Sequence, residues 1–228
     1  MATDALAAFE PRKKPVQARA TATVDAISEA TIQILLGVGA ERLTTTRVAE
    51  RAGVSVGTLY QYFPNKQSLL FAVLEDHLDK VASTIEAACE QASHGPLAGM
   101  IRQVVEAYVD IKLRRMDMSA ALYQVAADIG GPSLMKGVTR RMRRAIGAML
   151  LTASDVELPP DKFAIDLMLA AIAGAMRSAL EARASAAMFR KLREHLVLLC
   201  QTYMEAVTAR HLKQTGHARG ARTRSVSF

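Results

Sequence analysis

The side chains whose types and spacing could do chemistry lie between Thr44 and Lys66. Two short apolar-periodic stretches flank Gly53-Val54-Ser55 in this segment. Glycine adopts the positive φ of a tight turn without steric cost, and Thr44 and Ser55 are residue types that cap helix N-termini. Two short helices joined by such a turn form a helix-turn-helix, whose second helix lies in the major groove of DNA. The segment therefore predicts DNA binding.

The second stretch carries side chains suited to nucleic acid. Gln61 can bond bidentately to an adenine edge, and Thr58 offers a hydroxyl to phosphate and a methyl to thymine. The hydroxyls of Tyr60 and Tyr62 can reach phosphates, and Lys66 adds a positive charge beside a helix N-terminus. Most of these expected contacts hold the backbone of DNA, and few of them read bases.

Packing is the alternative role for the large side chains of this stretch. Leu59 and Phe63 are four residues apart, so both face inward on a helix and anchor it. Tyr60 and Tyr62 could also pack, but three adjacent large side chains cannot all point inward. We therefore expect Phe63 to be buried and the two tyrosines to face outward.

Helical periods continue on both sides of this segment. From Thr21 apolar residues recur at three- and four-residue steps until Gly37 and Gly39. Asn65 caps a long helix that Gly95-Pro96 ends. Five more helical stretches are expected after it, at 97–111, 118–129, 134–149, 161–183 and 187–211. The chain is thus expected to be all-α, with about nine helices and an N-terminal helix-turn-helix domain.

The same pattern predicts the domain organisation. The expected segments are a flexible basic arm at 1–18, a helix-turn-helix domain at 19–66, a connecting helix at 67–94, a second helical domain at 95–212 and a disordered tail at 213–228. Pro11 and Pro15 oppose helix in the arm, whose basic residues at 12–14 could follow phosphates or enter the minor groove. Basic residues outnumber acidic ones over 11–66, and the balance reverses over 67–91.

Composition bounds the class of protein. The 228 residues are 50% hydrophobic and carry a formal net charge of +7, which allows a sizeable core and permits a polyanionic partner. Asp4 and Glu10 precede the basic cluster, unlike in a signal peptide. The longest uncharged run, 52–65, is too short and too polar to cross a bilayer. A cytoplasmic protein is expected.

The sequence contains few features typical of enzymes or of metal-binding proteins. Cys89 and Cys200 have no Cys or His neighbour at zinc-ligand spacing, and two cysteines form no disulfide framework. No phosphate-binding loop with its lysine, HExxH pair or G-x-S-x-G elbow occurs. His77 and His195 each follow an acidic residue, but adjacent residues on a helix point in different directions. We therefore expect no catalysis, no metal and no cofactor.

The stretch LTTTRVAERAGVSVGTLYQYFPNKQSLL resembles the TetR family of bacterial transcriptional regulators. The likeness is strongest over 21–70, where the threonine cap, the AGVS turn, the LYQYF helix and the following lysine occur together at the family's spacing. Further along the chain, only the number and order of helices are similar. The resemblance implies DNA contacts by Thr45, Thr46, Val56, Gly57, Thr58, Tyr60, Gln61, Tyr62 and Lys66. Val56, being apolar, is expected to make only van der Waals contact.

The resemblance also implies a homodimer on a pseudo-palindromic DNA operator. The last two helices would pair with their copies as a four-helix bundle, and small residues over 163–183 would let the helices approach closely. The residues expected at this interface are Ala170, Gly174, Leu192, Leu196, Leu199 and Tyr203. The alternative is that these residues only close the core of one protomer.

A small-molecule effector, bound within 95–212, is the third implication of the resemblance. A flexible apolar cavity could be lined by Tyr108, Met116, Met118, Tyr123, Met142, Met149 and Met168. Ordinary core packing is the alternative for each of them. The basic cluster Arg140, Arg141, Arg143 and Arg144 could bind an anion or DNA, or could be a solvated helix face.

The expected function is that of a repressor which its ligand releases from DNA. Repression is the default for a dimer that occludes a promoter, although an activator of the same fold is an alternative. A ligand-independent architectural DNA-binding protein is another, but the second domain is larger than dimerisation requires.

Overall fold

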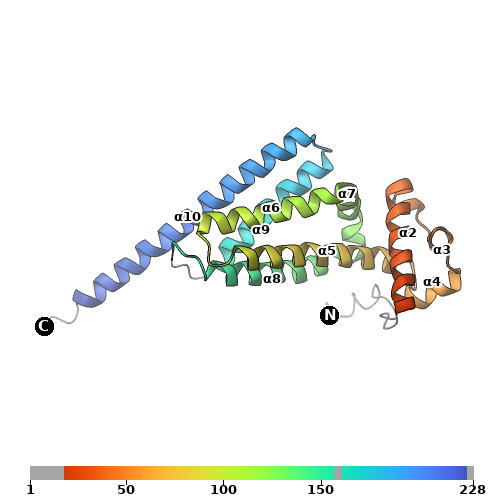
Figure 1. The fold of residues 1–228 in the computed structure, drawn as a ribbon, viewed down its shortest axis with the longest axis horizontal. Coiled ribbons are helices and arrows are strands. Elements are labelled where there is room, and N and C mark those ends of the chain that lie inside the picture. Colours follow the sequence, from red (N-terminus) through yellow and green to blue (C-terminus); the bar gives the residue numbers. More distant parts are fainter. Residues whose placement is uncertain (1–17, 157–160, 225–228) are drawn as a thin grey trace. The chain divides into compact units, whose positions relative to one another are not determined.

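The structure is a computed structural model that describes residues 18–156 and 161–224, with side chains described over 19–156 and 161–211. Regular structure in these ranges is entirely helical (Figure 1), which confirms the all-α prediction. The nine α-helices within the described ranges are α2 (Ala18–Arg42), α3 (Thr45–Ala52), α4 (Val56–Tyr62), α5 (Lys66–Ala92), α6 (Leu97–Arg114), α7 (Met116–Val125), α8 (Gly131–Leu150), α9 (Lys162–Glu181) and α10 (Ala186–Arg224). A 3-10 turn, Ala126–Ile129, follows α7.

The chain divides into two compact units. The first comprises the residues up to Ala82 together with Lys112–Val138, and the second comprises Ser83–Ile111 and the residues from Thr139 onward. Within the first unit, α2 packs against both α3 and α7. Residues 112–138 thus group with the helix-turn-helix, whereas the sequence suggested a second domain beginning at 95. The packing of α7 on α2 is a long-range interaction that helical periodicity does not reveal.

Helix α2 is interrupted at one of the two glycines that were predicted to end it. The helix extends to Arg42, but the backbone of Gly39, with φ 81° and ψ 168°, is not helical. Glycine tolerates this φ because it has no Cβ. Ile27, Thr31 and Leu35 are buried at four-residue spacing, so one face of α2 packs into the core of the first unit.

The turn between α3 and α4 is built as the sequence predicts. Gly53 has φ 68° and ψ 29°, the left-handed conformation. The Val54 N–H donates to the carbonyl oxygen of Ala49 at 3.0 Å, which closes the end of α3. The turn directs α4 so that Leu59 and Phe63 are buried, as expected for the two anchors of that helix.

Arginines of the basic cluster over 140–144 form ion pairs inside the second unit. Arg143 Nη1 lies 2.6 Å from Asp166 Oδ2, and Arg141 donates to both carboxylate oxygens of Glu86, at 3.0 and 2.7 Å. Two of the four arginines are therefore engaged with acidic side chains of neighbouring helices. This favours a surface helix face for the cluster over an anion-binding site.

Among the described helices, α9 is the one long and apolar enough to cross a membrane when judged by length and composition. A core helix of a soluble protein passes the same test, so the evidence for a membrane span is weak. The sequence criterion was the length of uncharged runs. Helix α9 does not meet it, because Asp166 and Arg177 interrupt its apolar residues.

Helix α10 is longer than the sequence predicts. Its backbone is helical to Arg224, whereas the sequence analysis predicts a disordered tail over 213–228. Apolar periodicity ends there and Gly216 and Gly220 disfavour helix, but no proline interrupts the segment. The expected arm before Ala18 and residues 157–160 and 225–228 lie outside the described residues.

Replacing Gly53 with alanine should lower the free energy of unfolding by about 1–2 kcal/mol, because a Cβ is strained in the left-handed region. No neighbouring atom lies within 4 Å of that Cβ position, so the loss would come from the backbone itself. Gly37 offers a matched control in equally open surroundings within α2. Gly37→Ala should leave stability unchanged or raise it by about 0.5–1 kcal/mol. Urea denaturation of both variants measures this, and equal losses would contradict the strain at Gly53.

Candidate nucleic-acid interface

Side-chain caps define the start of both short helices. Thr44 Oγ1 accepts the Arg47 N–H at 3.3 Å at the start of α3. Ser55 Oγ accepts the Thr58 N–H at 2.9 Å and lies 2.8 Å from Thr58 Oγ1. Each cap satisfies a backbone donor that has no partner within its helix. The second cap also holds the Thr58 hydroxyl in place at the start of α4.

Tyr60 and Thr45 meet between α4 and α3. The hydroxyl oxygens lie 3.1 Å apart, and the tyrosine is 41% exposed. Because one hydroxyl donates to the other, the accepting hydroxyl keeps its own proton for an external acceptor. The pair therefore presents a prepositioned hydrogen-bond donor on the surface, as contact with a phosphate oxygen requires.

Every residue expected to contact DNA is accessible in the structure. Thr46, Gly57, Tyr60 and Gln61 are exposed, and Thr45, Val56, Thr58, Tyr62 and Lys66 are half-buried. All nine belong to the first unit, and all but Lys66 lie on α3 and α4. Burial of Leu59 and Phe63 explains the arrangement, because the inward face of α4 is taken by these two residues.

Lys66 has a role in the fold that the sequence did not predict. Its Nζ donates to the carbonyl oxygen of Ala40 at 3.0 Å, which ties the start of α5 to the end of α2. The predicted cap beside it is confirmed, since Asn65 Oδ1 accepts the Ser68 N–H at 2.8 Å. An ammonium group carries three protons, so a bond to Ala40 is compatible with a phosphate contact.

A buried polar cluster lies in the same unit as these helices. Lys112 at the end of α6 is only 2% exposed, and its Nζ lies 3.2 Å from His77 Nε2 on α5 and 5.1 Å from the ring centroid of Tyr123 on α7. Ser119, also on α7, is 1% exposed, and its Oγ lies 3.4 Å from the same histidine nitrogen. Four polar side chains from three helices therefore meet in an apolar core.

The protonation of this cluster is strongly perturbed. Burial lowers the pKa of Lys112 to about 8. Burial also lowers the pKa of His77 to about 3, aided by the positive charges of Lys112, Lys80 and Arg115. His77 is therefore neutral near pH 7. This cluster was not predicted from the sequence, although Lys112 lies where the apolar stripe at 101, 104 and 108 would place another apolar residue.

The residues expected to line an effector cavity are not brought together as one set. Met116, Met118 and Tyr123 belong to the first unit, and Tyr108, Met142, Met149 and Met168 belong to the second. All are buried except Tyr123, which is half-buried, and Met116, which is exposed. None of the seven lines either of the two described hollows, one between α2 and α3 and one between α9 and α10. Burial of this kind is what ordinary core packing also produces.

Helices α9 and α10 expose a series of apolar side chains. Phe163 is 72% exposed and Leu167, Ala170 and Gly174 continue its stripe along α9. On α10 Met188, Leu198 and Leu199 are exposed, and Leu192 and Tyr203 are half-buried. Leu196 is a correction to the expected interface, because it is 3% exposed and packs into the protomer's own core. Periodicity alone does not show which apolar face of such a helix packs inward, so a residue of the inner face was assigned to the interface.

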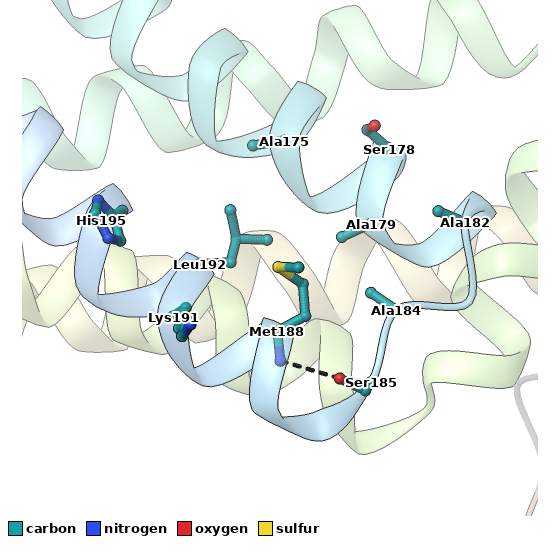
Figure 2. A pocket seen from close by; sticks show the side chains of 10 residues that line it. All are labelled: Ala175, Ser178, Ala179, Ala182, Ala184, Ser185, Met188, Lys191, Leu192 and His195. Atoms are coloured by element: carbon teal, nitrogen blue, oxygen red, sulfur yellow. Dashed lines mark hydrogen bonds between the residues drawn. The ribbon is translucent and has the colours of Figure 1, made fainter.

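The groove of about 720 Å³ between α9 and α10 is lined mostly by small and apolar side chains. Figure 2 shows Met188 and Leu192 pointing from α10 towards Ala175 and Ala179 on α9. Lys191 and His195 lie along the α10 side of the same groove.

The two thiols are not set up for chemistry. Burial raises the pKa of Cys89 to about 12, with help from Glu86 and Glu90, and raises that of Cys200 to about 11. Reactive cysteines require the thiolate, which is scarce at such pKa values. Within the described part of the chain, no group of three His, Cys, Asp or Glu side chains could hold a metal ion.

Comparison with known proteins matches both halves of the chain. Residues 27–73 match the model of bacterial regulatory proteins of the tetR family, and residues 96–204 match that of the tetracyclin repressor-like C-terminal domain. The sequence is 40% identical over 62 residues to the HTH-type transcriptional repressor KstR of Mycolicibacterium smegmatis, covering 27% of this chain and 30% of that protein. It is 45% identical over 51 residues to the class C tetracycline repressor protein of Escherichia coli, covering 22% and 23%. These curated relatives are thus matched over less than a third of their length.

Solved structures extend the likeness to most of the chain. A tetR-family transcriptional regulator from Streptomyces coelicolor superposes with a TM-score of 0.65 at 21% identity, covering 86% of this chain and 85% of that one. At this identity the comparison concerns the fold alone. The two family models show that the chain has the family's DNA-binding and C-terminal helical parts. The proteins of this family are not enzymes, and this chain belongs to the TetR family of DNA-binding transcriptional regulators.

Proposed function

We propose that this chain is a cytoplasmic homodimeric repressor that a small-molecule effector releases from a pseudo-palindromic operator. The observation that carries the DNA-binding part is the surface of α3 and α4, where Thr45 and Tyr60 share a hydrogen bond beside the exposed Gln61. In this arrangement the two hydroxyls hold phosphate and the amide reads a base edge. The nine residues predicted from the sequence form the proposed contact set.

Dimerisation is supported by the apolar surface of α9 and α10. A single helix-turn-helix buries too little area on DNA for tight, specific binding, so two copies on two half-sites are needed. Phe163, Leu167 and Leu199 expose apolar area to water, and small residues such as Ala170 and Gly174 beside them permit close helix approach. A second copy of the same face would bury this area, as in the proposed four-helix bundle.

Release by an effector requires a ligand with unequal affinity for two conformations of the dimer. The effector would bind within 95–212, where methionines allow a cavity to adapt its shape. Met116 fits this role least, because it is exposed. Repression rather than activation is favoured by the two curated relatives described above, both of which carry the word repressor in their names.

An architectural role in DNA organisation is the second candidate. A 72-residue stretch of the chain is 35% identical to the nucleoid occlusion factor SlmA of Haemophilus ducreyi. Sensitivity of DNA binding to small molecules separates the two candidates, since an architectural protein needs no effector.

A gel-shift titration against DNA flanking the coding region tests the proposed function. We expect a specific complex with a pseudo-palindromic site in the absence of any compound, and its loss with one member of a panel of apolar and anionic compounds. A complex that no compound dissociates would favour the architectural role. Failure to bind any pseudo-palindrome would overturn the proposal.

Tyr60→Phe should weaken operator binding by about 1.5–3 kcal/mol, which a hydrogen bond to a charged group contributes. The substitution removes only the hydroxyl, so the fold and the salt dependence of binding should stay unchanged, because no charge is lost. Fluorescence anisotropy at several salt concentrations measures both quantities. Wild-type affinity in this variant would show that the hydroxyl does not contact DNA.

Leu199→Glu should convert the dimer to a monomer, because it places a charge on the apolar face that a second copy would cover. Sedimentation velocity measures the change, and operator affinity should fall with it. Leu151→Glu is the control, since Leu151 is similarly exposed but lies outside α9 and α10. A dimer that survives the first substitution, or dissociates equally with the second, would place the interface elsewhere.

A further inference from the structure

We propose that Phe163 of one copy of this chain fills the groove between α9 and α10 of a second copy. This contact rests on the homodimer proposed above and fixes its register, in which the two α9 helices cross in antiparallel directions. Phe163 and the residues that line the groove all belong to the second unit. The contact therefore depends on the arrangement within one compact unit only.

Phe163 is the most exposed large apolar side chain in the described part of the chain. It lies in the first turn of α9 and is 72% exposed, and the next in order, Leu151, is 62% exposed. Covering the ring with another molecule would remove its apolar area from water. The groove of its own protomer is out of reach at the far end, because Phe163 and Ala182 are separated by roughly 28 Å of helix.

The groove has room for an aromatic ring. Its volume is about 720 Å³, and most of its lining side chains are no larger than serine. Figure 2 shows that these small residues come from the second half of α9 and from the turn after it: Ala175, Ser178, Ala179, Ala182, Ala184 and Ser185. Met188 on the α10 side offers a thioether sulfur, which makes favourable contacts with aromatic rings.

The spacing along α9 brings the ring and the groove together in an antiparallel pair. Ala170 and Gly174 are exposed near the middle of the helix, where small side chains let two helices approach closely. A two-fold axis at this point pairs residues that lie equally far from it on opposite sides. Phe163 precedes the midpoint by about nine positions, and the groove residues at 175–182 follow it by about three to ten. Each copy thus offers a ring and a groove to the other, whereas a parallel pair would place Phe163 against its own copy.

Charges beside the ring and the groove are complementary. Asp161 is exposed, and its Oδ1 caps α9 by accepting the Phe163 N–H at 2.9 Å. On the groove side, the described lining residues include Lys191 and His195 and no Asp or Glu. Lys162 next to the ring offsets part of this attraction, and water screens exposed charges. Burial of the ring therefore provides most of the contact energy, and the charges favour the antiparallel orientation.

Sedimentation equilibrium of the full chain over a concentration series tests the contribution of the ring. Phe163→Ala should raise the dimer dissociation constant at least about 100-fold, because each dimer loses two ring contacts of about tenfold or more each. Leu151→Ala is the matched control, since it truncates a similarly exposed side chain at the end of α8 and should stay within about twofold. The ring is exposed in the protomer, so the circular dichroism spectrum of Phe163→Ala should match that of the wild type.

Cysteine cross-linking tests the register directly. Phe163→Cys is combined in the same chain with Ser178→Cys or with Ala182→Cys, and each variant is oxidised under mild conditions. At least one of the two pairs should give disulfide-linked dimers on a non-reducing gel, since the bond requires Cα atoms within about 7 Å. Each single variant should stay unlinked. The native Cys89 and Cys200 are buried, so they should add little background.

Three results would overturn the contact and leave the proposed dimer standing. They are a dimer of unchanged affinity in Phe163→Ala, a dimer in which neither cysteine pair links, and cross-linking by Phe163→Cys alone, which indicates a parallel register. A wild-type chain that stays monomeric at every concentration, with and without operator DNA, would overturn both the contact and the proposed homodimer.

Discussion

The position of α4 depends on the left-handed turn at Gly53. With φ at 68°, this residue reverses the chain between two helices of eight and seven residues, which are too short to be stable alone. Their stability comes from the caps at Thr44 and Ser55 and from the burial of Leu59 and Phe63. Once those two side chains face the core, helical geometry leaves Tyr60 and Gln61 no direction but outward. The polar side chains on the exposed face of α4 are thus oriented by the packing of Leu59 and Phe63 beneath them.

Helix α2 links this surface to the rest of its unit. It packs on α3 and on α7, and its C-terminal end accepts a hydrogen bond from Lys66 at the start of α5. Movement of α5 or α7 would therefore act on the DNA-binding helices through α2. The buried cluster around Lys112 joins these same two helices, α5 and α7, through polar groups.

Local features of the chain could be predicted from the sequence, whereas long-range ones could not. Turn and cap residues act on their immediate neighbours, so Gly53, Ser55 and Asn65 were assigned correctly from residue type and position. The packing of α7 on α2 and the meeting of Lys112 with His77 join residues far apart in the chain, and no period of 3.6 encodes them. The expected interface residue Leu196 failed for a related reason. Helix α10 is apolar on two faces, and only the folded chain shows that Leu196 belongs to the inner one while Leu198 and Leu199 belong to the outer.

In the proposed function, Gln61 on α4 reads a base of the operator while its neighbours hold phosphate. Selection of bound sites from a library of randomised half-sites, with the wild type and Gln61→Ala in parallel, tests this role of Gln61. We expect the variant to lose the preference for adenine at one position, at the same place in both half-sites, and to keep the preferences elsewhere. An unchanged base preference at every position would contradict the claim that Gln61 lies against a base edge in the major groove.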